Sequence, residues 1–183
     1  MLMSIKYKNN EGFTLIELLI VIAIISILSS IVLASLSAAR AKAKDAKRLS
    51  DMHQIQIALE LYNSTYGHYP SGDNAGCFGW DTSADGTFIT ALVQNKFLPS
   101  NILDPSINSN NCGNYFYYKY PAGWDGYCDP SRGAFYVLGI GVMESVGTGK
   151  VYPGSPGWSC PGNGGNDWQK TSGFSWITGG FEN

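Results

Sequence analysis

The sequence predicts an α+β protein in which one long N-terminal helix packs on a small antiparallel sheet. Three patterns predict this fold. They are an apolar run over residues 13–36, a one-sided apolar stripe that continues to residue 66, and aromatic and β-branched segments beyond residue 114. We therefore expect a leader over residues 1–12, two helix halves over 13–37 and 38–66, and a globular head over 67–183.

The apolar run from Phe13 to Leu36 is long enough to cross a membrane. Its roughly 24 residues form about 36 Å of helix, and the hydrocarbon core of a bilayer is about 30 Å thick. The run contains no Gly or Pro, and its polar side chains besides Glu17 are only Thr and Ser. Hydroxyl groups of this kind can bond to the helix backbone, so a membrane-spanning helix is predicted.

Glu17 is the exception within the apolar run. A carboxylate near the start of a membrane span is costly, although less so near the interface than at the bilayer centre. An ionisable residue in this place is by default a functional residue and calls for a cationic partner. The alternative is a plain signal anchor whose glutamate lies by chance among the lipid headgroups.

The residues around Glu17 carry a specific pattern, Gly12-Phe13-Thr14-Leu15-Ile16-Glu17. A secretory signal would place its cleavage site after the apolar run, whereas here the glycine precedes it. The pattern resembles the leader signature of the type IV pilin superfamily. The resemblance implies that a prepilin peptidase cuts between Gly12 and Phe13 and that Phe13 is then N-methylated. It also implies that Glu17 pairs with this amine on a neighbouring subunit.

The helix is expected to continue beyond the membrane. Residues 38–48 are good helix formers and include five basic side chains. An apolar stripe then recurs at steps of three or four residues: Leu49, Met52, Ile55, Leu59, Tyr62 and Tyr66. Gly67 and Pro70 end the helix. Many pilins have a proline where this chain has Ala34, so an unbroken helix is predicted here.

The basic residues bear on membrane orientation. Five follow the span and two, Lys6 and Lys8, precede it, so charge alone favours the reverse orientation. The leader motif overrules this count, because members of the resembled family are inserted by recognition of that segment. We interpret the basic cluster as a solvated helix face, with lipid headgroups or acidic neighbours in a fibre as alternative contacts.

Four cysteines lie beyond the span, at Cys77, Cys112, Cys128 and Cys160, and predict two disulfides on the exported side. Three pairings are possible. We favour the one that joins Cys112 to Cys128 and Cys77 to Cys160. A zinc site would need closely spaced pairs such as C-x-x-C, and the sequence contains none.

A loop before the sheet contains alternating oxygen donors, Asp81-x-Ser83-x-Asp85, like those of a calcium loop. The acidic ligand expected at the twelfth position is missing, because Leu92 stands there. The favoured alternative is a polar turn that caps a short helix over Thr87–Phe97. No cofactor is expected, with calcium as the one candidate. Other acidic residues in the loops could also bind calcium: Asp125, Asp129 and Asp167.

Two strands are predicted at Tyr115–Tyr120 and Ala134–Val142, with a further strand at Lys150–Tyr152, at Phe174–Thr178 or at both. The segment from Ala91 to Pro105 is similar to the one that precedes the sheet in major pseudopilins of type II secretion.

Enzymatic chemistry is not expected. His53 and His68 do not form a metal pair, and no nucleophile motif occurs. The net charge of −2 argues against nucleic acid as the main partner. The tyrosines of residues 115–120, with Lys119, could stack on bases as in DNA-capturing pilins, but a role in the sheet is favoured.

The resemblance implies a structural subunit of a type IV pilus-like filament. Such a subunit is an inner-membrane precursor that is later polymerised outside the cell or in the periplasm. Its partners would be further copies of the chain, the prepilin peptidase and methyltransferase, an assembly platform, and the membrane. Two alternatives stay open: a pseudopilin of a type II secretion or competence system, and a membrane-tethered binding protein that does not polymerise.

Overall fold

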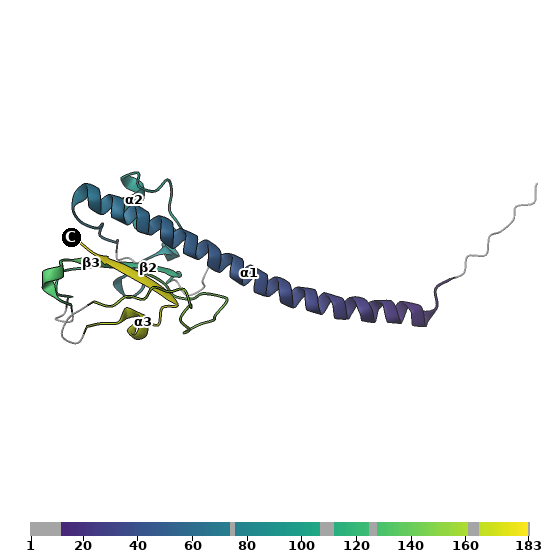
Figure 1. Cartoon of the computed structure of the whole chain (residues 1–183). Helices are drawn as coiled ribbons and strands as arrows, with labels where there is room; N and C mark the ends of the chain where they lie inside the picture. The colour runs from purple at the N-terminus through teal and green to yellow at the C-terminus, as the bar shows by residue number, and fades with distance from the viewer. Residues whose placement is uncertain (1–11, 74–75, 107–111, 125–127, 161–164, 183) are drawn as a thin grey trace, which may run out of the picture. The chain divides into compact units, whose positions relative to one another are not determined.

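The computed structural model describes residues 12–73, 76–106, 112–124, 128–160 and 165–182. The fold is α+β, with one long helix and an antiparallel sheet (Figure 1). The elements are α1 (Leu15–Tyr66), β1 (Asp81–Thr82), α2 (Thr90–Gln94), β2 (Tyr115–Tyr120), β3 (Phe135–Ile140), α3 (Trp168–Thr171) and β4 (Trp176–Phe181). Short 3₁₀ helices lie at Cys77–Gly79, Ser83–Asp85 and Pro130–Arg132. The chain divides into two compact units, with the boundary between Arg40 and Ala41 in the sequence of α1.

Helix α1 confirms the predicted single helix, which passes the position of Ala34 without a break. It ends at Gly67, whose φ of 74° lies in the left-handed region that glycine adopts without a steric penalty. The Gly67 N–H donates to the Asn63 carbonyl at 2.7 Å, which satisfies one of the last carbonyls of the helix.

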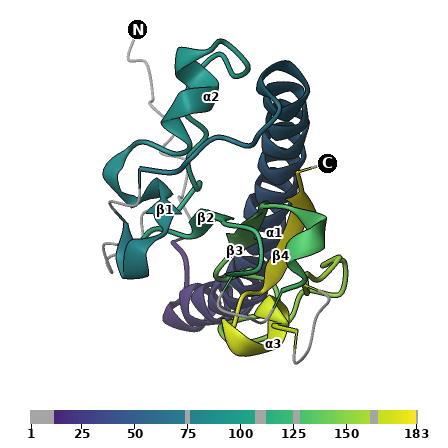
Figure 2. The ribbon, with the colours of Figure 1, turned by 90° about the vertical axis from the view of Figure 1, so that its left-hand side faces the viewer.

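The four strands form one antiparallel sheet in the order β1-β2-β3-β4 (Figure 2). Strand β2 has the predicted bounds, and β3 is shorter than the predicted Ala134–Val142. Strand β4 begins two residues later than the predicted Phe174–Thr178. The other candidate, Lys150–Tyr152, forms no strand, although the Tyr152 N–H donates to the Ser175 carbonyl at 2.7 Å.

The two faces of the sheet bury two different clusters. Tyr115 and Tyr117 of β2 pack in one cluster with Met52, Ile55 and Leu59 of α1, all at most 1% exposed. The alternation of side chains along β2 and β3 sends other residues to the opposite face. There the second cluster includes Trp168 of α3, and Figure 1 shows α3 and α1 on opposite sides of the sheet.

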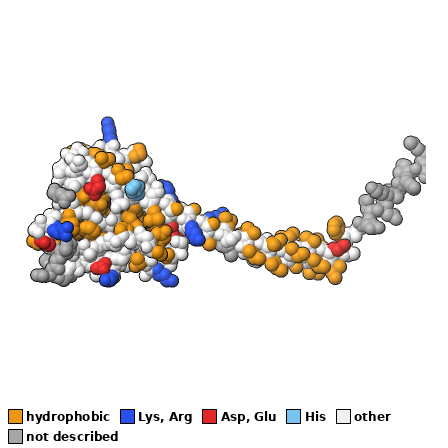
Figure 3. All heavy atoms as spheres, viewed as in Figure 1, with side chains coloured by type: hydrophobic (Ala, Val, Ile, Leu, Met, Phe, Trp, Pro, Cys, Tyr) orange, Lys and Arg blue, Asp and Glu red, His pale blue; other side chains and the backbone are white. Residues whose placement is uncertain are grey.

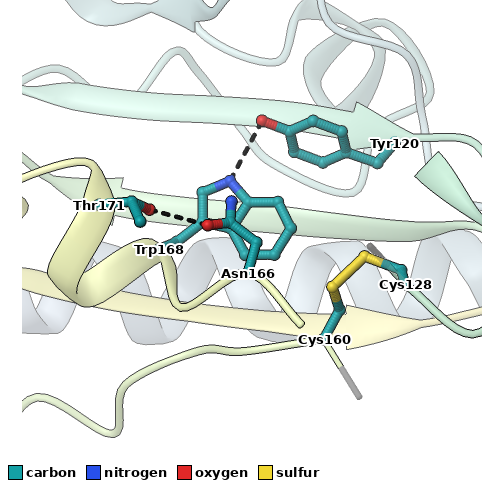
Figure 4. Close-up of a disulfide and its surroundings, with 6 residues drawn as sticks. All are labelled: Tyr120, Cys128, Cys160, Asn166, Trp168 and Thr171. Carbon is teal, nitrogen blue, oxygen red and sulfur yellow. Dashed lines mark hydrogen bonds between the residues drawn. A yellow bond between two sulfur atoms is a disulfide. The ribbon is translucent and has the colours of Figure 1, made fainter. Parts of the chain in front are cut away.

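The second cluster is aromatic and lies beside a disulfide. Trp168 is 1% exposed, and its indole N–H donates to the Tyr120 hydroxyl at 3.3 Å (Figure 4). The Tyr120 ring stacks on Phe135 with centroids 5.0 Å apart. The bond between Cys128 and Cys160 joins the two loops that cover this face.

The disulfides join Cys77 to Cys112 and Cys128 to Cys160, so the favoured pairing was wrong. The reason is strand pairing. Cys112 lies shortly before β2, and β2 pairs with β1, which closely follows Cys77. The bonds link residues 35 and 32 positions apart, and closing loops of this length stabilises a fold by about 3–4 kcal/mol each in the chain-entropy treatment.

Helix α2 is shorter than the predicted Thr87–Phe97. It begins at Thr90 because Ile89, with φ 46° and ψ 56°, has the left-handed conformation. This conformation is unfavourable for a β-branched residue. The buried Asp81 carboxylate accepts the Ile89 N–H at 3.1 Å, and the Ile89 side chain is fully buried.

A buried ionic cluster connects the second half of α1 to the loops that contain Asp104 and Glu144. Arg48 is 1% exposed and donates to Asp45 at 2.8 Å, to Asp104 at 2.6 Å and to Glu144 at 3.0 Å. Burial raises the pKa of Asp45, but hydrogen bonds from Ser145, Arg48 and Glu144 outweigh it and lower the pKa overall. The expectation of a wholly solvated basic face was therefore wrong at Arg48.

The neighbouring lysines of this segment are paired as well. Lys44 lies 3.2 Å from Glu144, and Lys47 pairs with the buried Asp51. The Tyr115 hydroxyl also donates to Asp51, at 2.9 Å, and so connects the cluster to the sheet.

We predict that Arg48→Ala lowers the free energy of unfolding by about 3–5 kcal/mol, because it leaves buried carboxylates without their cation. Urea unfolding of the full chain in detergent, followed by tryptophan fluorescence, measures this. Arg40→Ala, at an exposed position of α1, is the matched control and should change stability by less than about 0.5 kcal/mol. Equal effects of the two substitutions would contradict the role of the cluster.

Candidate functional site

The start of α1 is a capping box. The Thr14 N–H donates to Glu17 Oε2 at 2.8 Å, and the Thr14 hydroxyl donates to the same oxygen at 2.7 Å. In return the Glu17 N–H donates to the Thr14 hydroxyl at 3.3 Å. A Thr and a Glu three residues apart satisfy helix N–H groups in this reciprocal way. Within the described chain Oε1 accepts no hydrogen bond, so it can receive a donor from another molecule.

The bond between Gly12 and Phe13 lies outside the helix. Residues 12–14 precede α1, and the Phe13 side chain is 88% exposed. A side chain added at Gly12 would meet no atom within 4 Å. The glycine is therefore not required by packing, and the peptide bond that follows it is accessible to a protease.

The apolar segment that follows presents its side chains outward. Exposed fractions run from 42% at Leu36 to 79% at Leu15, and Figure 3 shows hydrophobic side chains covering this segment. An 18-residue window has a mean hydropathy of 2.8, with none of it buried, so length and composition suffice to cross a membrane. Helices can span lipid because their backbone groups are satisfied internally.

The serines of this segment bond to the helix backbone, as expected. Ser26 donates to the Ile22 carbonyl at 2.7 Å and Ser30 donates to the Ile27 carbonyl at 2.7 Å. Each hydroxyl proton is therefore satisfied within the helix and costs little in an apolar environment.

The calcium candidates use their oxygens for backbone contacts. Asp81 accepts the N–H groups of Asp73 and Ile89, and Ser83 accepts the Tyr115 N–H at 3.4 Å. Asp85 accepts the Thr87 N–H at 2.9 Å. Among the described residues, no three His, Cys, Asp or Glu side chains are grouped closely enough to hold a metal. The calcium loop stays a prediction.

The other calcium candidates occupy helix starts. Asp129 accepts the Ser131 N–H at 2.9 Å, and Asp167 accepts the Lys170 N–H at 3.3 Å. Both therefore act as N-caps of short helices. Asp125 lies outside the described residues.

Asp81 has an unusual environment. It is fully buried, and its Oδ1 has no hydrogen-bond partner within the described part of the chain. Burial, together with the nearby charge of Asp73, raises the pKa of Asp81 to about 6. The ionised carboxylate is therefore destabilising in the folded head near neutral pH.

We predict that Asp81 makes the head less stable as the pH rises from about 4 to about 6. The folded state holds a proton in this range that the unfolded chain, with an ordinary pKa of 3.8, releases. Between pH 4 and pH 7 the wild type should therefore lose up to about 3 kcal/mol more of its free energy of unfolding than Asp81→Asn, which has no carboxyl group to titrate at this position. Urea unfolding at a series of pH values measures this.

Asp129→Asn is the matched control, because hydrogen bonds from Ser131 lower the pKa of Asp129 and move its titration below this range. A constant difference between wild type and Asp81→Asn across the range would contradict the assignment.

Comparison with known proteins supports the N-terminal motif. A family model described as the prokaryotic N-terminal methylation motif matches residues 7–33. The chain is 40% identical over 63 residues to the type II secretion system core protein G of Escherichia coli (strain K12), covering 34% of this chain and 43% of that protein. It is 45% identical over 62 residues to the type IV wide pilus major component PilA4 of Thermus thermophilus, covering 32% and 47%.

A further relative is the type II secretion system core protein G of Aeromonas hydrophila, 36% identical over 64 residues, which are 35% of this chain and 45% of that protein. The chain therefore spans less than half the length of these curated relatives. No solved structure matches the chain. The matches confirm the resemblance to pilins and pseudopilins at the N-terminal motif and over about a third of the chain.

Proposed function

We propose that this chain is the structural subunit of a type IV pilus-like filament. The precursor is inserted in the inner membrane, cut after Gly12, N-methylated at Phe13 and polymerised. The observation that carries the proposal is the placement of the Gly12–Phe13 bond directly before an apolar helix with an acidic fifth residue. The methylation-motif match over residues 7–33 supports it.

The exposed apolar segment supports polymerisation. Its side chains, from Leu15 to Leu36, lack partners among the described residues and are unsuited to water. If this segment leaves the bilayer, its side chains stay out of water only when they pack against other apolar surfaces. The same segments of further copies of the chain supply such surfaces. Between helices in lipid the driving force is close packing rather than the hydrophobic effect.

Glu17 is proposed to set the register between copies. After cleavage the Phe13 amine is a cation near neutral pH, because α-amino groups titrate around pH 8. A desolvated carboxylate and a desolvated ammonium are each costly alone and tolerable as a pair. The oxygen that the capping box leaves open, Oε1, is suited to accept this amine from a neighbour.

The proposed steps of insertion, cleavage, methylation and polymerisation determine the partners of the chain. They are a prepilin peptidase and methyltransferase, an assembly platform, the membrane that holds the precursor, and further copies of the chain. The finished filament is proposed to lie outside the cell or in the periplasm, and the role includes no enzymatic activity. We propose calcium only as an accessory ligand of the loop that contains Asp81, Ser83 and Asp85.

A pseudopilin role is the second candidate. Relatives named as type II secretion core proteins support it. The resemblance of the segment from Ala91 to Pro105 to pseudopilin sequences favours it as well. Electron microscopy of sheared surface fibres, with mass spectrometry of their subunit, separates the two roles. A pilin forms the surface fibres, whereas a pseudopilin is absent from them and affects secretion or DNA uptake when deleted.

We predict that mass spectrometry of the working protein finds an N-terminus at Phe13 carrying one methyl group. The same analysis of a strain without the peptidase should find the uncut precursor. An N-terminus at Met1, or one created after the apolar segment, would support the remaining alternative, a tethered binding protein that does not polymerise.

We predict that Glu17→Ala leaves the protein in the membrane and reduces filament yield at least tenfold, because the amine of the neighbour loses its anion. Filaments are measured by shearing and immunoblotting against the membrane fraction. Glu17→Gln is the matched control, since its amide oxygen can still accept from Thr14 but carries no charge. If the glutamine variant assembles normally, helix capping rather than charge pairing explains the residue.

A further inference from the structure

A hollow walled by aromatic rings lies on the face of the sheet opposite α1. Its volume is about 310 Å³, at the lower end of the range of small-molecule sites, which is about 300–1,000 Å³. Its aromatic walls include members of the second cluster described above. The residues that line it are Phe78, Trp80, Phe116, Gly141, Ser172 and Phe174.

Three of the rings stand steeply to one another, like the walls at the corner of a box. The planes of Trp80 and Phe116 meet at 83°. Phe174 meets Trp80 at 62° and Phe116 at 64°. The ring centroids are 5.2–6.3 Å apart. Walls placed in this way turn ring faces toward the space between them, and the face of an aromatic ring carries partial negative charge.

Phe78 lies at the edge of the hollow in an unfavourable conformation. Its φ of 59° and ψ of 23° fall in the left-handed region, which bulky residues rarely adopt. Its apolar side chain is 93% exposed. It follows Cys77, whose bond to Cys112 holds this turn near the start of β2. Residues with a strained backbone gather at ligand sites, and here the strained residue is one that lines the hollow.

Gly141 keeps one side of the hollow open. A Cβ atom added there would lie 3.1 Å from Phe116 Cε2 and 3.2 Å from Asn114 Oδ1, so a larger residue would crowd the ring. The backbone of Gly141 is not in the left-handed region, so space rather than conformation accounts for the glycine.

The lining offers aromatic faces and almost no hydrogen-bonding groups. Among the described residues that line the hollow, Ser172 has the only polar side chain, and none is charged. A saccharide or a primary ammonium would lose its hydrogen bonds to water here without replacement. A quaternary ammonium has no N–H group to satisfy and carries its positive charge beneath apolar methyl groups. Aromatic faces attract such a cation.

We propose that this hollow binds a quaternary ammonium group, such as the trimethylammonium of choline. The cation–π contact that the described chain itself makes, Arg132 at 4.9 Å from the Phe181 ring centroid, uses a ring outside this hollow. The trimethylammonium group occurs in free choline and in the headgroup of phosphatidylcholine, and the experiment separates these sources. The site does not depend on polymerisation and goes beyond the proposed filament.

Titration of choline into the full chain, followed by the NMR signal of the choline methyl groups, tests the site. The chain is held in a maltoside detergent, which carries no ammonium group. We expect saturable binding. Dimethylbutanol, the uncharged tert-butyl analogue of choline, and ethanolamine, the primary amine, should each bind at least about tenfold more weakly, because one lacks the charge and the other keeps its N–H groups.

The matched ligands make the inference falsifiable. Equal binding of choline and dimethylbutanol would show a merely apolar hollow and would overturn the assignment, and so would the absence of saturable choline binding. Glycerophosphocholine, the soluble form of the lipid headgroup, is titrated in parallel. If it binds as tightly as choline, the lipid headgroup is the source, whereas much weaker binding assigns a free choline-like ligand. Both of these results support the site.

Substitution of Phe78 tests the aromatic wall. Phe78→Leu keeps an apolar side chain without a ring and should weaken choline binding about fivefold, whereas Phe78→Tyr keeps the ring and should preserve it. Both variants should fold, because the side chain is 93% exposed, and thermal unfolding checks this.

Tyr66→Leu is the matched control, since Tyr66 is an aromatic residue of α1 that is 47% exposed and does not line the hollow. Its choline affinity should equal that of the wild type. Wild-type affinity in Phe78→Leu, or equal losses in Phe78→Leu and Tyr66→Leu, would contradict the binding site.

Discussion

The packing of the second half of α1 against the sheet is the contact on which the head depends. Met52, Ile55 and Leu59 are at most 1% exposed and lie against the tyrosines of β2, and Arg48 adds a buried ionic connection to two loops. Between Leu15 and Leu36 the same helix keeps its large apolar side chains exposed. One continuous helix therefore has an exposed apolar half and a half that is buried on one side. Both are possible because the backbone hydrogen bonds of a helix need no outside partner.

The sequence predicted the elements that local pattern determines. The step of three or four along Met52, Ile55 and Leu59 predicted α1, and the aromatic run of residues 115–120 predicted β2 with its bounds. Strand β1 has only two residues and exists through pairing with β2, so no local pattern could predict it. Helix α2 is shorter than predicted because Ile89 has a left-handed backbone conformation, which β-branched residues rarely adopt. Its N–H donates to the buried Asp81, a contact that the local sequence does not reveal.

The functional and buried polar residues likewise include some that the sequence indicated and one, Arg48, whose role it did not indicate. Glu17 was singled out as the acidic exception in the apolar run, whereas the roles of Gly12 and Phe13 were implied by the resemblance to the pilin leader signature. The capping role of Thr14 could have been found from the T-x-x-E pattern. Arg48 gave no such signal. Its partners Asp104 and Glu144 lie 56 and 96 residues further along the chain, and only the folded head brings them together. Its basic neighbours made a solvated face the natural expectation.

The disulfide arrangement bears on how the head responds to reducing conditions. The first cysteine bonds to the second and the third to the fourth, so the two closed loops follow one another without overlapping. Each bond therefore closes its own stretch of the chain, and reducing one of them leaves the loop closed by the other intact.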